Sequence, residues 1–165
     1  MVSSTEPDWQ REKSMRFWDP SRKLLKSIRD YQKYRNKKSY VMSFYKNLAV
    51  IRHRFWSIVT GADIQLNSQI DGGLLIPHPN GIVIHPKSTI GPNCLIFQQV
   101  TIGEKDGGIP KIGGHVDIGA GAKVLGGIVI GNHVCIGANA VVINDVADGC
   151  TVAGIPARVI SKSKN

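Results

Sequence analysis

Aliphatic residues recur at every sixth position through the second half of the chain. Thirteen residues form three runs of constant phase: Ile64, Ile70 and Ile76; Ile84, Ile90, Ile96 and Ile102; and Ile112, Ile118, Val124, Ile130, Ile136 and Val142. A six-residue period fits neither an α-helix nor an alternating strand. It fits a short strand followed by a turn, with three such units in each triangular coil. The pattern therefore predicts a parallel β-solenoid whose coils stack about 4.8 Å apart.

Two insertions interrupt this period. The step from Ile76 to Ile84 is eight residues instead of six, and the step from Ile102 to Ile112 is ten. A loop that interrupts a solenoid must leave its wall, and departures from a consistent pattern are where functional sites are expected. The first insertion contains His78, with a proline on each side of it. This position makes His78 the first candidate for chemistry.

The residues before the repeat follow a helical period instead. Between Ser21 and about Thr60, apolar residues recur at spacings of three and four, which predicts two amphipathic helices joined by the polar residues 35–39. We therefore expect a disordered tail over residues 1–15, a basic α-helical segment over 16–60 and the β-solenoid domain over 61–165.

The net charge of +9 lies almost entirely in the helical part. Residues 1–60 contain 14 Lys and Arg against 5 Asp and Glu, whereas residues 61–165 contain 7 of each sign. With Trp18, Phe55 and Trp56 as apolar anchors, this charge predicts salt-sensitive association with an anionic membrane surface. The alternative is a solvated helical face. No motif that reads nucleic acid accompanies the charge, so we expect no nucleic-acid partner.

Cysteine and histidine spacing argues against a disulfide framework or a metal site. Cys94, Cys135 and Cys150 are odd in number and lack CxxC spacing. The five histidines do not show the three-ligand spacing of a zinc enzyme. We expect no metal. Since no signal peptide or membrane-length apolar stretch is present, we expect a cytoplasmic protein, peripheral to the membrane if its basic helices bind one.

Asp63 is the natural partner for His78. It stands fifteen residues earlier, at the start of the repeat phase, and one coil takes about eighteen residues. The two side chains should therefore approach the same corner in successive coils. An imidazole backed by a carboxylate is a general base with a pKa near working pH. The alternative is a surface histidine in a proline turn.

Residues 61–103, GADIQLNSQIDGGLLIPHPNGIVIHPKSTIGPNCLIFQQVTIG, resemble the serine acetyltransferase branch of the hexapeptide-repeat acyltransferases. The resemblance continues through PKIGGHVDIGAGAKVLGG and covers about residues 41–160. It implies a left-handed parallel β-helix and an acetyl-CoA-dependent O-acetyltransferase. In that family, the residues matching His78 and Asp63 deprotonate an acceptor hydroxyl, which attacks the thioester of acetyl-CoA. A backbone amide near Gly103 would hold the oxyanion.

The resemblance also implies where acetyl-CoA binds. The cofactor of such enzymes lies in a groove between neighbouring subunits, which implies a homotrimer or a multiple of one. The backbone at Ala120 and Ala138 would contact the cofactor, and Lys123, Arg158 and Lys162 would meet its phosphates. Simple packing of small residues in a repeat is the alternative explanation for the two alanines.

Departures from the family pattern concern the acceptor. Pro77 replaces an aspartate, and Gly108–Ile109 replace an arginine–histidine pair in a loop about four residues shorter. Asp19, in a DPS motif, matches an acceptor-binding aspartate. We therefore expect the acceptor to be a sugar hydroxyl of a cell-surface polysaccharide. The alternatives are L-serine, as in cysteine biosynthesis, and a non-catalytic β-helix that binds a partner.

Overall fold

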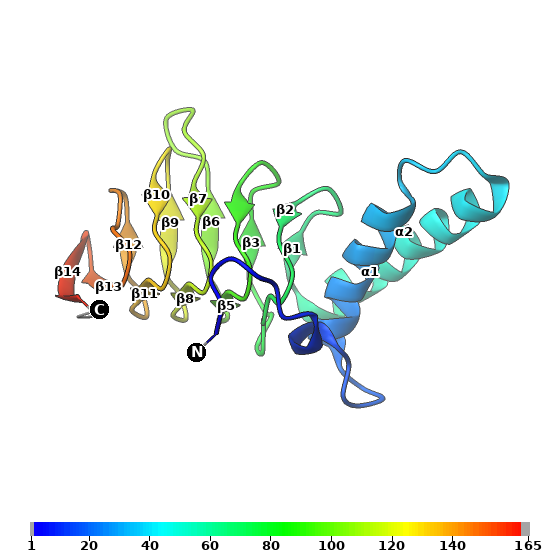
Figure 1. The fold of residues 1–165 in the computed structure, drawn as a ribbon, viewed down its shortest axis with the longest axis horizontal. Helices are drawn as coiled ribbons and strands as arrows, with labels where there is room; N and C mark the ends of the chain where they lie inside the picture. Colours follow the sequence, from blue (N-terminus) through cyan, green and yellow to red (C-terminus); the bar gives the residue numbers. More distant parts are fainter. Residues whose placement is uncertain (1, 163–165) are drawn as a thin grey trace.

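The structure is a computed structural model that describes residues 2–162. Residues 1 and 163–165, at the outer ends of the predicted tail and of the predicted β-solenoid domain, lie outside the described residues. The short strands wind into a parallel β-solenoid of about four turns, with two helices at its N-terminal end (Figure 1). The architecture matches a left-handed parallel β-helix, which confirms the predicted fold class.

Three sheets form the walls of the β-helix. Sheet A contains β1 (Asp63–Ile64), β3 (Val83–Ile84), β6 (Thr101–Gly103), β9 (Lys123–Leu125) and β12 (Val141–Val142). Sheet B contains β2 (Gln69–Ile70), β4 (Thr89–Ile90), β7 (Lys111–Ile112) and β10 (Val129–Ile130). Sheet C contains β5 (Leu95–Ile96), β8 (Asp117–Ile118), β11 (Cys135–Ile136), β13 (Cys150–Gly154) and β14 (Ala157–Lys162). All described strand pairs are parallel except β13 with β14, which close the last coil as an antiparallel pair.

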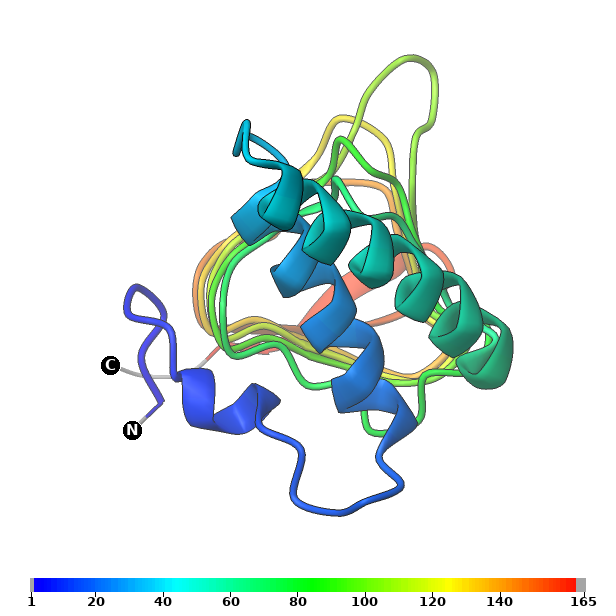
Figure 2. The ribbon, with the colours of Figure 1, turned by 90° about the vertical axis from the view of Figure 1, so that its right-hand side faces the viewer.

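The aliphatic residues of the six-residue repeat point into the interior of the coils. Each of the thirteen aliphatic residues is at most 6 % exposed. The chain reaches sheets A, B and C in turn, so one side chain from each wall points inward in every coil. In Figure 2 the coils superimpose along the axis in a triangular outline. Removal of this apolar surface from water is the main stabilising contribution to the β-helix.

Helices α1 (Pro20–Tyr34) and α2 (Tyr40–Thr60) form where the apolar spacing predicts them. Asp19 caps the N-terminus of α1 by accepting a hydrogen bond from the Arg22 amide, and proline occupies the first turn. Gly61 ends α2 with a φ of 65°, a left-handed conformation that glycine adopts without steric cost. The chain then enters β1 directly.

Helix α1 covers the open end of the β-helix (Figure 2). Its buried residues Leu24, Leu25 and Ile28 belong to the same apolar cluster as the coil interior. Helix α2 packs across α1 and buries only Ala49, Trp56 and Thr60. One helix therefore completes the core, while most of the other faces outward.

Residues 2–15 differ from the predicted disordered tail, because they lie along the β-helix. A 3-10 helix, η1 (Trp9–Glu12), forms within them. The buried Asn93 amide donates to the carbonyls of Ser3 and Glu6 and accepts from the Asp8 amide, each at 2.8 Å. Such polar contacts between positions 85 or more residues apart leave no periodic trace in the sequence, which is why the sequence alone did not predict them.

Two histidines stack at the corner between sheets B and C. The Nδ1 atoms of His115 and His133 lie 2.9 Å apart, and both residues have left-handed φ angles of 54° and 57°. Burial lowers the pKa of His115, and the positive charges of His133 and Arg11 lower it further, although Asp117 opposes them. The folded protein therefore resists protonation at this site.

This arrangement predicts a loss of stability in mild acid. Below the ordinary pKa of 6.5, the unfolded chain binds the His115 proton before the folded chain does, so stability falls as the pH falls. We expect the melting temperature of His115→Asn to decrease less than that of the wild type between about pH 7.5 and about pH 5.5. Asparagine suits the left-handed backbone, as at Asn93, whose φ is 62°. Thermal unfolding at both pH values checks this, and equal slopes for the two proteins would contradict it.

Candidate active site at the corner between sheets C and A

The corner where the chain passes from sheet C to sheet A carries three of the predicted site residues, His78, Ala120 and Ala138. Backbone hydrogen bonds connect its successive levels: the Gln99 amide to the Asn80 carbonyl, the Gly121 amide to Gln98, and the Asn139 amide to Ala120, at 2.8 to 2.9 Å. His78, Ala120 and Ala138 therefore lie along one edge of the β-helix. Residues about twenty positions apart in the sequence become neighbours on that edge.

The first insertion widens this corner and exposes His78. The Gly81 amide donates to Gly61 at 2.9 Å, and the Ile82 amide donates to Pro79 at 3.2 Å, so the coil closes again after the insertion. Gly81 has a φ of 70°, which suits glycine at the turn. The prolines flanking His78 have no amide that would need a partner outside the wall. The His78 imidazole is consequently free to face solvent and a ligand.

Asp63 lies at the same corner. Its amide donates to the Ile82 carbonyl at 2.8 Å, and its Cα is in register with that of Val83. Its side chain is exposed, as is that of His78. Within residues 2–162, the structure shows no hydrogen bond between the two side chains. The corner therefore brings the predicted pair to one region, and their contact stays a prediction.

His78 lines a cleft of about 680 Å³ between this corner and the helical segment. The residues before α1, the first turn of α1 and the end of α2 form the opposite wall, including Arg16, Trp18, Asp19 and Val59. Asp19 and His78, both predicted as site residues from the sequence, line this one cavity. Arg16 was not predicted, because one arginine in a basic segment carries no distinguishing signal.

Asp19 has a structural role in this cleft. Its carboxylate accepts from the Arg22 backbone at 3.4 Å and pairs with the Arg22 guanidinium at 3.2 Å. Burial raises the pKa of Asp19, but the hydrogen bonds from Arg22 and Met15 and the charge of Arg22 outweigh burial, so the pKa is lowered overall. The carboxylate is therefore ionised at neutral pH and stabilises the start of α1. Its acceptor-binding role stays a prediction.

The other predicted site residues lie outside this cleft. Gly103 ends β6, and Lys123, at the start of β9, donates through Nζ to the Gln99 carbonyl at 2.6 Å. Arg158 and Lys162 are exposed on β14, at the far end of the β-helix from the helices (Figure 1). Their roles toward a cofactor remain predictions.

The second insertion forms a projecting hairpin, which stands out beyond the coils in Figure 1. Lys105 and Gly108 exchange backbone hydrogen bonds of 2.9 and 3.0 Å. Asp106 and Gly107 both have positive φ angles, as in a type I′ turn. Lys105 forms an ion pair with Asp106 at the tip. Gly108 and Ile109 thus leave one side of the hairpin uncharged. They stand at the positions that match the arginine–histidine pair of the family that the sequence resembles.

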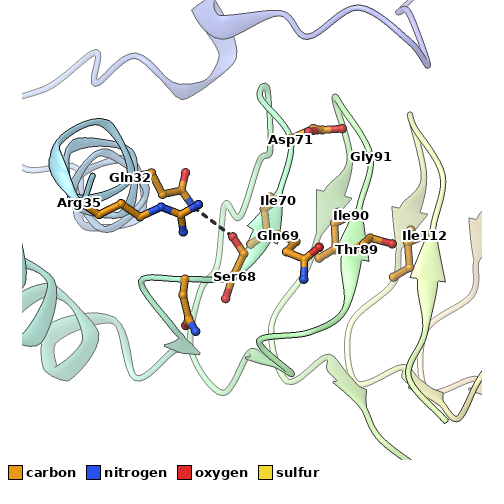
Figure 3. A pocket seen from close by; sticks show the side chains of 11 residues that line it. Gln32, Arg35, Ser68, Gln69, Ile70, Asp71, Thr89, Ile90, Gly91 and Ile112 are labelled. Carbon is orange, nitrogen blue, oxygen red and sulfur yellow. Dashed lines mark hydrogen bonds between the residues drawn. The ribbon is translucent and has the colours of Figure 1, made fainter. Parts of the chain in front are cut away.

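A second groove, of about 540 Å³, lies between α1 and sheet B. Figure 3 shows its polar lining, with the Gln32 amide donating to the Ser68 carbonyl at 3.0 Å. None of the predicted site residues lines this groove. We therefore assign the candidate active site to the cleft with His78.

The thiols and other ligating side chains give no sign of a metal centre. Burial raises the pKa of the Cys94 thiol to about 11, so this cysteine stays protonated at neutral pH. Within the described part of the chain, no group of three His, Cys, Asp or Glu side chains could hold a metal ion.

Comparison with known proteins identifies relatives of one kind. Serine acetyltransferase of Haemophilus influenzae is 35 % identical over 158 residues, covering 93 % of this chain and 59 % of the relative. That of Synechococcus elongatus is 46 % identical over 110 residues, covering 64 % of this chain and 45 % of the relative. The chain thus spans about half the length of these relatives. No protein-family model matches the chain.

Solved structures agree with the sequence relatives. A serine acetyltransferase in complex with CoA is 35 % identical with a TM-score of 0.73, covering 87 % of this chain and 58 % of that one. Another, in complex with cysteine, is also 35 % identical with a TM-score of 0.74, covering 90 % and 57 %. Repeat, fold and similarity agree, and the chain belongs to the serine acetyltransferase-like branch of the hexapeptide-repeat acyltransferases.

Proposed function

We propose that this protein is an acetyl-CoA-dependent O-acetyltransferase in which His78 is the general base. The observation that carries the proposal is the position of His78, exposed in a widened corner and lining a cleft. The similarity to a serine acetyltransferase solved with CoA supports acetyl-CoA as the acyl donor. Asp63, at the same corner, would orient the imidazole and stabilise its protonated form.

The proposed reaction moves one proton twice. His78 takes the proton of the acceptor hydroxyl as that oxygen attacks the thioester carbonyl. The negative charge on the carbonyl oxygen of the tetrahedral intermediate would be held by a backbone amide near Gly103. The carbon–sulfur bond then breaks, and the CoA sulfur receives the proton from the imidazolium. The products are an acetyl ester and free CoA thiol, and His78 returns to its neutral state.

We extend the proposal to the path of acetyl-CoA. Ala120 and Ala138 follow His78 along the same corner, so a cofactor lying on that edge would contact their backbone. Lys123 could leave its carbonyl partner to meet a phosphate, and Arg158 and Lys162 lie further along the solenoid. A neighbouring subunit would close this edge into a groove, so we retain the homotrimer as part of the proposal.

We propose L-serine as the acceptor, in place of the sugar hydroxyl that the sequence favoured. The relatives and solved structures reported above are serine acetyltransferases, which supports the amino acid over a polysaccharide. The cleft also supplies a cation, because Arg16 lines it together with His78, whereas Lys105 of the hairpin is paired with Asp106. Among the described residues, the Arg16 guanidinium has no carboxylate partner, so it would be available to a serine carboxylate.

A sugar acceptor remains the second candidate because of the hairpin. The side formed by Gly108 and Ile109 carries no charge, and a hydroxyl acceptor without a zwitterionic head needs none. Sites that bind both charged groups of an amino acid discriminate by up to about 10⁴-fold against ligands lacking them. Arg16 should therefore decide between the two acceptors.

The acceptor proposal is tested by kcat/KM for L-serine, nucleotide sugars and surface glycans with labelled acetyl-CoA. We expect serine to be the best substrate, at about 10⁴ M⁻¹s⁻¹ or above. Arg16→Gln should raise the KM for serine about tenfold or more, because a charge-assisted hydrogen bond is lost. The matched control Arg54→Gln removes an exposed arginine outside the cleft and should change nothing. Faster transfer to a sugar would favour the second candidate, and no turnover with any acceptor would indicate a non-catalytic binding protein.

A further inference from the structure

Helix α2 carries an apolar stripe along its outer face, in which Tyr45 stacks on Tyr34 of α1 and the other residues are largely uncovered. Its exposed hydrophobic residues are Tyr40, Val41, Phe44, Tyr45, Leu48, Ile51, Phe55, Ile58 and Val59. Six of these nine are more than half exposed, and Tyr40 and Ile58 reach 97 % and 83 %. Spacings of three and four align them on one side of the helix. Isolated exposed hydrophobic residues are ordinary, but a continuous stripe along a 21-residue helix marks an interaction surface.

The charges around this stripe are of one sign. Helix α2 contains no Asp or Glu, and its charged residues are Lys46, Arg52 and Arg54. The loop leading into it adds Arg35, Lys37 and Lys38, all exposed. Arg52 pairs with Asp30 at 2.9 Å, whereas the described structure shows no ion pair for the three loop residues. The stripe is therefore bordered by positive charge that the protein does not neutralise.

We propose that α2 lies on an anionic lipid surface, with the stripe in the interface and the basic residues at the headgroups. A helix with aromatic and aliphatic residues on one face and Lys or Arg at its borders is suited to that position. Each basic residue near such a surface adds attraction to anionic lipid. Within residues 2–162, no helix is both long enough and apolar enough to cross a bilayer. The proposed contact is thus peripheral.

Charge decides between lipid and a second copy of this chain as the occupant. The stripe residues Val41, Phe44, Leu48, Ile51, Phe55 and Ile58 follow the 3-4 spacing of a coiled-coil seam. A paired helix, however, would need opposite charges along the borders of the seam. The bordering positions hold Tyr45, Asn47, Arg52, Arg54 and Val59, so their only charges are positive, and a second α2 would bring only the same residues. Like charges oppose this pairing, whereas anionic lipid neutralises them.

The docking surface reaches the candidate active site. Val59, at the end of the stripe, also lines the cleft with His78, as do the exposed Met15 and Trp18 from the same wall as Val59. Figure 1 shows α2 at the end of the molecule, where the β-helix does not cover it. A protein docked through this stripe would hold the mouth of the cleft near the headgroups. This inference does not depend on which acceptor is used.

Flotation of the full chain with lipid vesicles tests the proposal. We expect the protein to float with phosphatidylcholine vesicles containing phosphatidylglycerol at low salt, and to remain behind with phosphatidylcholine alone. Added salt should release it, because surface charges are screened within about 8 Å at physiological ionic strength. The double variant Phe44→Glu/Ile51→Glu should bind at least about tenfold more weakly. Both positions are exposed, so circular dichroism should confirm that the variant folds.

The matched control places the same charges at the opposite end of the molecule. Val159→Glu/Ile160→Glu changes two exposed apolar residues on β14 and should float like the wild type. Arg35→Gln/Lys37→Gln/Lys38→Gln should weaken binding to anionic vesicles while the stripe is intact. Absence of flotation at low salt would overturn the proposal. The proposal would also be overturned if the Phe44→Glu/Ile51→Glu variant had a lower mass than the wild type in light scattering without lipid and the same flotation. A second copy of the chain would then cover the stripe.

Discussion

Replacing His78 by alanine is expected to lower the rate of acetyl transfer by about 10²–10⁴-fold. Among the described residues that line the cleft, His78 carries the only imidazole, the side chain that most often serves as a general base. Without it, the hydroxyl must lose its proton to water while it attacks the thioester. Because the loss occurs in the transition state, kcat and kcat/KM should fall together. Acetyl-CoA binding should stay nearly unchanged, since the side chain is exposed and supports no packing.

Steady-state thioester consumption with each acceptor measures this effect. Asp63→Asn is the companion variant, and its rate loss should be smaller because it removes the orienting carboxylate and keeps the base. His85→Ala is the matched control, because His85 is partly exposed on the neighbouring strand end and does not line the cleft. Near-normal turnover of His78→Ala would refute the assignment of the general base. Equal losses in His78→Ala and His85→Ala would show that the effect is not specific.

Replacing Ile102 by alanine should destabilise the protein by about 2–5 kcal/mol. Ile102 is 0 % exposed in the middle of sheet A, where β6 pairs with β3 on one side and β9 on the other. Its neighbours in register are Ile84 and Val124, both buried. Backbone hydrogen bonds fix the spacing of the coils, including a 2.8 Å bond from the His85 amide to the Ile102 carbonyl. The wall therefore cannot collapse into the cavity that the truncation leaves.

Denaturant unfolding at fixed protein concentration measures this loss. Ile160→Ala removes the same atoms from a residue that is 66 % exposed on β14, and its cost should stay within about 0.5 kcal/mol. If Ile102→Ala lowers the free energy of unfolding no more than Ile160→Ala does, the placement of the repeated aliphatic residues in the solenoid interior is contradicted.

Much of the architecture could be predicted from the sequence because it depends on local periods. All thirteen residues of the six-residue phase are buried in the β-helix, and the three-and-four spacing placed both helices with their connection. The two interruptions of the phase located the widened corner and the hairpin. In each case a repeated contact leaves a repeated residue type, which one sequence displays without an alignment.

The sugar acceptor, by contrast, was inferred from residues that the hairpin lacks. Gly108 and Ile109 occupy the positions that match the family motif. Arg16 lies outside that motif, in the residues before α1, which have no regular pattern and whose distance from His78 is set by the fold. Similarity to serine acetyltransferases then favoured the alternative.

The sequence by itself determined the β-helix, the two helices and the exposed position of His78, because hydrophobic burial and turn chemistry act over a few residues. Only the tertiary structure decided which distant segments meet. It placed residues 2–15 along the β-helix through side chains that include Asn93 and Glu12, used Asp19 as a helix cap, and joined the loop before α1 to the His78 corner. It also left the apolar face of α2 largely uncovered inside the described chain. These contacts are few and mostly polar, and the apolar face of α2 is exposed. No periodic pattern of side chains in the sequence encodes either feature.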